Sequence, residues 1–309
     1  MSIKNLPEID IQERVELIEQ TKTFIVAVSG GVDSIVLLHK LVTSMEGIPD
    51  HRAPVYIVAH FDHGIREDSG ENAEFVRTLA QHYSLPFELG SAELGADASE
   101  EQARTARYAF LREMKSKHGA HMIITAHHQD DLLETMIINL LRGTSPRGLS
   151  PMNAPDILRP LIHSIKDELV DYAQSHELQW REDPTNDDET YLRNHIRKQI
   201  LPKLDMHREQ LLTIQKRVAD IYHDVDIRTS HLLPKFNVMT RSHFVQFPYI
   251  VQREIMRAWL IRHNVSVDTK EIVERCVMAV KTLPHGKKID IDGENWLSSE
   301  KNSVVIVAK

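Results

Sequence analysis

Residues 24–34 read FIVAVSGGVDS, and this stretch decides the fold. The apolar run at 24–28 predicts a buried strand, and the apolar residues at 35, 38, 41 and 42 predict a helix. A glycine-rich turn between them lets the backbone approach a ligand closely, with N–H groups and the positive helix end directed at an anion. The sequence therefore predicts a phosphate loop, made of Ser29, Gly30, Gly31, Val32, Asp33 and Ser34.

This loop differs from a Walker A loop in its chemistry. It lacks the Gly-Lys-Ser/Thr ending, so transfer of a γ-phosphate is not implied. Asp33 would repel a phosphate unless a divalent cation bridges the two groups, which predicts Mg²⁺ here. The alternative is an ordinary glycine-rich turn that caps a core helix.

Strands and helices alternate through the first half of the chain. Further strands are expected at 55–61, 87–89 and 122–126, and helices at 71–83, 99–117 and 130–142. Ser99 and Gln102 have the spacing of a capping box at the start of the long helix. This alternation predicts an α/β fold, with a parallel N-terminal sheet covered by helices on both faces.

The pattern changes after about residue 160. Helices are expected at 166–177, 190–200, 204–224, 248–263 and 268–282, and strands near 287–291, 294–298 and 304–307. Asp292-Gly293 is a hairpin signal. We expect a catalytic domain at 1–215 and a smaller α+β domain at 216–309, whose core includes a stripe at Ile250, Ile255, Met256, Trp259 and Leu260.

Composition excludes several classes of protein. The 309 residues are 41% hydrophobic and 27% charged, as in a globular protein with a sizeable core. The single cysteine, Cys276, excludes an intrachain disulfide and a cysteine-based zinc cluster. The first twenty residues are too polar for a signal peptide, and no apolar run approaches the ~18 residues of a membrane span. We therefore expect a cytoplasmic protein without membrane contact.

Polar residues of the types that take part in catalysis and ligand binding gather where the predicted strands end and on two helices. Because the carboxyl ends of parallel strands form ligand sites, these residues are active-site candidates. They are His60, Phe61, Asp62, His63 and Arg66 after the second strand, Arg104 and Arg107 on the long helix, and His127, His128, Asp130, Asp131 and Glu134. The alternatives are strand-end caps, arginines that solvate a helix face, and a metal pair at His127 and Asp131, spaced for one helical face.

Basic residues are concentrated at 193–217, where seven Lys/Arg stand against two Asp/Glu in a chain of net charge −8. Such a segment suits contact with a nucleic-acid backbone. Candidate contacts are Arg142, Arg147, Arg193, Arg197 and Lys198. The alternative is a solvated helix with ion pairs to the acidic loop at 182–189.

These motifs, in this order, closely resemble the bacterial tRNA(Ile)-lysidine synthetase family, within the PP-loop (N-type) ATP pyrophosphatase superfamily. The resemblance rests on SGGVDS, HFDHGIR at 60–66, ARTARY at 103–108, HHQDDLLET at 127–135 and the EDPTN and YLRNHIR segments, and it covers about residues 24–202. Gln129, Leu132 and Ser145-Pro146 depart from the family pattern. The length resembles the short form of the family, without an additional C-terminal tRNA-binding domain.

The resemblance implies a reaction and its participants. The substrates would be ATP, with Mg²⁺, free lysine and an isoleucine tRNA with a CAU anticodon. Cytidine 34 would be adenylated at its O2 and then attacked at C2 by the lysine ε-amine, giving lysidine, AMP and diphosphate. Asp33, Arg107, His127 and Asp131 would be catalytic, Asp33 and Asp131 would hold Mg²⁺, and His60 and Phe61 would lie near the base. A homodimer is expected on the same ground.

Other functions remain open on the sequence alone. A tRNA thiolase would use catalytic cysteines or an iron–sulfur cluster, and Cys276 is the only cysteine. An amide-forming enzyme would need a source of ammonia. A metal-dependent phosphoesterase would account for the His and Asp pairs but not for SGGVDS, and a non-catalytic nucleotide-binding module would not use the polar strand ends.

Overall fold

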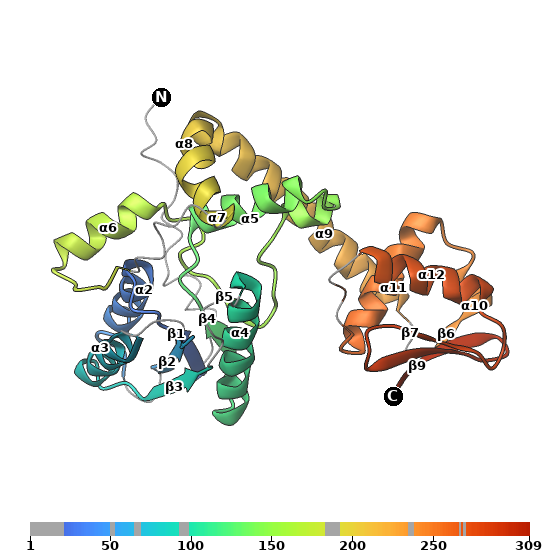
Figure 1. Cartoon of the computed structure of the whole chain (residues 1–309), viewed down its shortest axis with the longest axis horizontal. Coiled ribbons are helices and arrows are strands. Elements are labelled where there is room, and N and C mark those ends of the chain that lie inside the picture. Colours follow the sequence, from blue (N-terminus) through green and yellow to red (C-terminus); the bar gives the residue numbers. More distant parts are fainter. Residues whose placement is uncertain are drawn as a thin grey trace. The chain divides into compact units, whose positions relative to one another are not determined.

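A computed structural model describes residues 22–49, 53–64, 69–92, 99–182, 192–233, 238–265, 267 and 270–309 (Figure 1). The chain divides into two compact units, Met1–Thr213 and Ile214–Lys309. The dividing point falls inside a long helix, α9 (Arg208–Leu232). None of the helices in the described part of the chain is long and apolar enough to cross a membrane.

The first unit is built on a parallel sheet, as the alternating pattern predicts. Its strands are β1 (Thr23–Ala27), β2 (Val55–Asp62), β3 (Phe87–Ser91), β4 (Met122–Ile124) and β5 (Ile157–Leu158), in the order β3-β2-β1-β4-β5. The chain builds outward from β1 to β3 and then returns to place β4 on the other side of β1. The strand order therefore reverses at β1, and ligands of open α/β sheets bind at such a point.

Side chains of β1 alternate between two cores, one on each face of the sheet. Phe24 and Val26 pack with α2 (Val32–Thr43), α3 (Ser69–His82) and α6 (Lys166–Ser175). Ile25 packs on the opposite face with α4 (Glu100–Lys117). A strand buried on both faces must be apolar throughout, which explains the uninterrupted run at 24–28.

Further elements of the first unit follow the sheet. The predicted capping box of α4 is confirmed, because Ser99 and Gln102 each accept a hydrogen bond from the other's backbone N–H. Within the segment expected as one helix at 190–200, the described residues 192–200 form a short helix followed by a π-helical turn. The remaining elements are α5 (Gln129–Leu141), η1 (Pro146–Leu149), α7 (Leu192–His195), η3 (Ile196–Ile200), α8 (Leu201–Leu204) and η4 (Asp205–His207).

The second unit is a small α+β structure with its own core. Its antiparallel sheet has the order β6-β9-β8-β7, from β6 (Val238–Thr240), β7 (Lys288–Asp290), β8 (Asn295–Ser299) and β9 (Ser303–Ala308). Its helices are α10 (Arg241–Phe244), α11 (Tyr249–Arg262) and α12 (Lys270–Thr282). Trp259 and Leu260 are fully buried as expected, whereas Ile250 is 70% exposed because it lies on the outer side of α11. The inclusion of Ile250 in the core was therefore wrong.

Candidate active site

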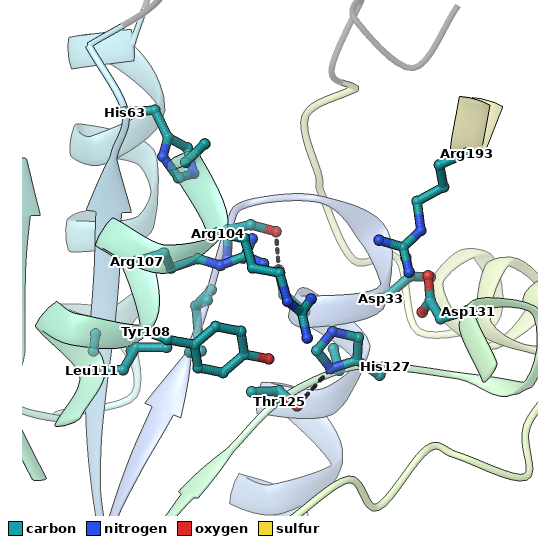
Figure 2. Close-up of a pocket in the computed structure, with 17 residues that line it drawn as sticks. Asp33, His63, Arg104, Arg107, Tyr108, Leu111, Thr125, His127, Asp131 and Arg193 are labelled. Carbon is teal, nitrogen blue, oxygen red and sulfur yellow. Dashed lines mark hydrogen bonds between the residues drawn. The ribbon is translucent and has the colours of Figure 1, made fainter. Parts of the chain in front are cut away.

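A cavity of about 370 Å³ lies at the carboxyl end of β1, where the strand order reverses. It is bounded by the 29–34 loop, by α4 and by the turn that leads into α5 (Figure 2). Side chains expected at an active site from three separate motifs meet in it. They are Ser29, Asp33, Arg104, Arg107, His127 and Asp131.

The 29–34 loop is organised from within by Ser34. The buried Ser34 hydroxyl accepts hydrogen bonds from the N–H groups of Ser29 and Gly30, both at 3.2 Å, and donates to the Gly31 carbonyl at 2.8 Å. Ser34 therefore shapes the loop and does not present a free hydroxyl to a ligand. Gly31 precedes α2 without a side-chain cap, which leaves the positive end of that helix open to an anion.

Two residues that were not predicted as site residues anchor the 29–34 loop through hydrogen bonds to its backbone carbonyls. Asn72 Nδ2 donates to the Ser29 carbonyl at 2.8 Å, and the Arg181 N–H donates to the Gly30 carbonyl at 3.0 Å. These bonds occupy loop carbonyls that would repel a phosphate. Gly30 has φ +95°, and a Cβ atom there would lie 2.3 Å from Asn72 Oδ1, so glycine is required on two grounds.

Arginine side chains form the wall opposite the loop. Arg104 and Arg107 share a face of α4, as expected, with their guanidinium carbons 4.9 and 5.6 Å from the centre of the Tyr108 ring. Arg159, which follows β5, does not line the cavity: it is only 7% exposed and donates to the Met152 carbonyl at 2.6 Å, but its charge acts on His127. Concentrated positive charge in a cavity beside a phosphate loop suits a highly charged anion.

His127 lies between this basic wall and the acidic residues of α5. The pKa of His127 is lowered to about 3, mainly by burial; Asp131 opposes this shift, and the charges of Arg159, Arg107 and Arg104 add to it. Its Nδ1 atom is 2.8 Å from Thr125 Oγ1, which fixes the ring. His127 precedes α5, so the expectation that it shares a helical face with Asp131 was wrong. Within the described residues, no group of His, Cys, Asp and Glu is arranged to hold a metal ion by itself.

The two carboxylates expected to hold Mg²⁺ lie on either side of His128. His128 Nε2 is 3.4 Å from Asp131 Oδ2 and 3.7 Å from Asp33 Oδ2. Burial acts to raise the pKa of Asp131, but His128 and His127 outweigh it and hold the pKa below its usual range. Mg²⁺ takes oxygen ligands, usually one or two carboxylates together with phosphate oxygens. The donor set therefore fits this ion when a nucleotide supplies the phosphates.

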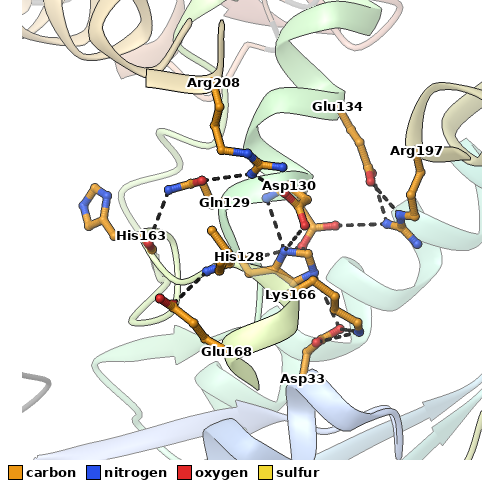
Figure 3. Close-up of polar contacts among 12 residues, drawn as sticks. Asp33, His128, Gln129, Asp130, Glu134, His163, Lys166, Glu168, Arg197 and Arg208 are labelled. Atoms are coloured by element: carbon orange, nitrogen blue, oxygen red, sulfur yellow. Dashed lines mark hydrogen bonds and ion pairs between the residues drawn. The ribbon is translucent and has the colours of Figure 1, made fainter. Parts of the chain in front are cut away.

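A lysine missed by the sequence analysis neutralises Asp33. Lys166 Nζ donates to both carboxylate oxygens, at 2.7 and 2.8 Å (Figure 3). Lys166 is the first residue of α6, where the helix dipole disfavours a cation. A lysine at the start of a predicted helix was thus an available, though weak, signal of an external carboxylate partner.

Glu134 joins α5 to the segment at 192–200. Its side chain is completely buried and accepts hydrogen bonds from Arg193 Nε at 2.9 Å and from Arg197 Nε at 2.6 Å. Burial raises the pKa of Glu134, although Arg197 and Arg193 oppose that shift. Arg193 and Arg197 were expected at a nucleic-acid surface, but here their guanidinium groups bind carboxylates of the first unit.

Arg208, at the start of α9, extends the same network. It donates to Gln129 Oε1 at 2.9 Å and forms a close ion pair with Asp130 (Figure 3). Gln129 is one of the departures from the family pattern, and the structure gives it this contact. The other basic candidates are Arg142, which is exposed at the end of α5, and Arg147 and Lys198, which are partly buried.

His60 and Phe61 of the second strand, expected near the nucleotide base, make contacts within the protein instead. His60 is buried and its Nδ1 is 2.7 Å from the Val28 carbonyl, and Phe61 packs against Phe110. Asp62 accepts a hydrogen bond from the Gly64 N–H at 2.8 Å. His63 lines the cavity, whereas His60 and Phe61 do not. Arg66 lies outside the described residues.

A phosphate loop after the first strand, at the reversal of strand order, defines an α/β nucleotide-binding protein. Comparison with known families narrows this class. A family model described as a PP-loop domain matches residues 6–204, and the chain belongs to this family.

Several curated bacterial relatives carry one name, tRNA(Ile)-lysidine synthase. The relative from Enterococcus faecalis is 37% identical over 202 residues, which is 62% of this chain and 42% of the relative. The relative from Thermotoga maritima is 33% identical over 238 residues, which is 74% of this chain and 55% of the relative. The chain spans about half the length of the curated relatives it matches.

A solved structure has a similar fold. It is the U34-tRNA thiolase NcsA from Methanococcus maripaludis with its [4Fe-4S] cluster, which matches 67% of this chain and 74% of its own. The TM-score is 0.55 and the sequence identity is 16%, so this likeness concerns the fold alone.

Proposed function

We propose that this protein uses ATP to join free lysine to C2 of cytidine 34 in the CAU anticodon of an isoleucine tRNA. The observation that carries the proposal is the cavity in which Asp33, Arg107, His127 and Asp131 meet beside the phosphate loop. The relatives named tRNA(Ile)-lysidine synthase support the choice of substrate. The place of action is the cytoplasm, where tRNA and free lysine are both present.

The first step activates the cytidine. ATP binds with its phosphates on the 29–34 loop, and the cytidine O2 attacks the α-phosphorus. The bond from that phosphorus to the β-phosphate oxygen breaks, and diphosphate leaves. Arg104 and Arg107 stabilise the charge that develops on the phosphoryl oxygens, a role that suits fixed cations in a cavity. Asp33 and Asp131 would hold Mg²⁺, which would supply further positive charge.

The second step forms the carbon–nitrogen bond. The lysine ε-nitrogen attacks C2, the C2–O2 bond breaks, and AMP leaves with that oxygen. The ammonium must first lose a proton, and the structure suggests a division of roles. Asp131 is ionised at neutral pH and suits binding of the ammonium, whereas His127 is neutral and suits acceptance of the proton. Bound phosphates would offset the arginine charges that lower the pKa of His127, and so strengthen it as a base.

Recognition of the tRNA requires cytidine 34 to leave the anticodon stack, as in other complexes with single-stranded RNA. Arg142, Arg147 and Lys198 remain candidates for contact with the RNA backbone. Arg193 and Arg197 are better assigned to holding Glu134, because their guanidinium groups bind its carboxylate. The residues from 216 onward would add tRNA contact, and a homodimer is expected as in short members of the family.

The test is incorporation of radiolabelled lysine into a CAU-anticodon isoleucine tRNA transcript. We expect label in the tRNA only when ATP, Mg²⁺ and the full chain are all present, and none when cytidine 34 is replaced by uridine. Adenylation without lysine incorporation would reassign the nucleophile. Release of orthophosphate with no AMP would favour a phosphoesterase and refute the proposal.

A further inference from the structure

Lys166 and Asp33 lie 133 residues apart in sequence and form a close ion pair at the phosphate loop. The ammonium contacts both carboxylate oxygens, at 2.7 and 2.8 Å. The Lys166 side chain is nevertheless 40% exposed and the Asp33 side chain 27% exposed. The pair is therefore specific in geometry but weak in energy, because partly exposed ion pairs are screened by water.

Packing of α6 against α2 brings Lys166 to this position. Leu169 and Ala173 of α6 are buried in the same core as α2. Six residues beyond the ion pair on each helix, His39 Nδ1 is 3.0 Å from the Tyr172 hydroxyl. The two helices thus run in the same direction, with both N-termini at the phosphate loop. The backbone of Lys166 is anchored, while its long side chain can leave Asp33 for solvent.

Lys166 holds the oxygens that a metal–nucleotide complex needs. A divalent cation that bridges Asp33 and phosphate oxygens must take at least one oxygen of that carboxylate. Both oxygens accept from the ammonium, so the two cations compete for the same ligand. Two other groups lie less directly on Asp33: His128 Nε2 is 3.7 Å from its carboxylate and closer, at 3.4 Å, to that of Asp131, and Arg197 interacts with Asp33 through its charge.

We infer that Lys166 is a positioning residue that orients Asp33 before the nucleotide binds and yields the carboxylate when Mg²⁺ arrives with ATP. This inference rests on the proposed function only in requiring that MgATP binds at Asp33. The ion pair reduces the fraction of protein that is ready to bind the metal, and the apparent affinity for Mg²⁺ falls in proportion. For a partly exposed pair the expected effect is about two- to fivefold.

The experiment measures nucleotide binding and needs no turnover. A fluorescent, non-hydrolysable ATP analogue is bound to the full chain while Mg²⁺ is titrated, for wild type and for three variants. Lys166→Met removes the charge and keeps the length, and Lys166→Arg keeps the charge. Lys40→Met is the matched control, because Lys40 lies on α2 over the Tyr172 ring, 4.3 Å from its centre, and away from Asp33.

We expect Lys166→Met to lower the half-saturating Mg²⁺ concentration about two- to fivefold, and Lys166→Arg and Lys40→Met to resemble wild type. An unchanged or higher Mg²⁺ requirement in Lys166→Met would overturn the inference, because Lys166 would then not compete with the metal. If wild type bound no MgATP, the proposed function itself would fail. This result is distinct from failure of the inference about Lys166, in which wild type binds MgATP but Lys166→Met needs no less Mg²⁺.

A second measurement does not depend on any variant. Amine acetylation of Lys166 in the wild-type chain is followed by peptide mass spectrometry, with and without the MgATP analogue. Release from Asp33 should increase the rate of labelling, with Lys40 as an internal reference. A decrease confined to Lys166 would place its ammonium on the nucleotide instead and would contradict its release.

Discussion

Replacing Glu134 by glutamine should destabilise the first unit strongly, because this carboxylate is completely buried between two arginines. Arg193 Nε lies 2.9 Å and Arg197 Nε 2.6 Å from its oxygens. Breaking a buried ion pair by removing one partner costs about 3–5 kcal/mol, because the other charge is left uncompensated. Arg193 keeps a hydrogen bond to Thr135 Oγ1 at 2.8 Å, so we expect the free energy of unfolding to fall by about 3 kcal/mol.

The assay is hydrogen exchange along a urea titration, resolved by peptide. Peptides from α5 and β4 report on the first unit, and peptides from the second unit are the internal reference. Glu74→Gln is the matched control, because its pair with Arg77 is 3.2 Å long and its side chain is 68% exposed. Such surface pairs contribute about 0–1 kcal/mol. If Glu134→Gln and Glu74→Gln lowered the free energy of unfolding equally, the large stabilisation assigned to the buried Glu134 ion pairs would be refuted.

Three further predictions follow from the site. Gly30→Ala should abolish binding of MgATP, measured by calorimetry, because the positive φ and the 2.3 Å approach to Asn72 both oppose a Cβ atom. Adding Asn72→Ala should restore binding only in part, because the positive φ remains. Because the pKa of His127 is low in the folded protein, the free energy of unfolding should fall as the pH drops from about 6.5 toward about 3. In urea titrations, wild type should lose about 2 kcal/mol more than His127→Asn between pH 7.5 and 5. Equal losses would contradict a buried neutral imidazole. Arg107→Ala should stop AMP formation while circular dichroism stays unchanged, and near-normal turnover would remove Arg107 from the chemistry.

The sequence predicted the parts of the fold that depend on local patterns. The strand β1, its glycine-rich loop and α2 follow from adjacent residues whose apolar spacing and glycines leave few alternatives. The strand β5 was missed because its two residues, Ile157 and Leu158, form a strand only through pairing with β4. The exposed position of Ile250 was likewise missed, because the packing partners of α11 decide which side of that helix is buried.

The candidate site was predicted where motifs are compact and missed where contacts are long-range. Asp33, Arg107, His127 and Asp131 were chosen from their motifs, and the structure places them around one cavity. Asn72, Arg159, Lys166, Arg181 and Arg208 were missed, because each acts through a partner remote in sequence. The nucleic-acid role of Arg193 and Arg197 was inferred from charge alone, and a buried carboxylate such as Glu134 cannot be recognised from composition.

The most direct test of the central claim is identification of the phosphate products formed from ATP. The full chain is incubated with ATP, Mg²⁺, lysine and the CAU-anticodon tRNA, and the nucleotides are separated by chromatography. Wild type should form AMP and diphosphate in amounts equal to the lysine incorporated, and Asp33→Asn should form neither. Formation of ADP and orthophosphate, or of AMP without dependence on the tRNA, would contradict α-phosphate transfer to cytidine at this site.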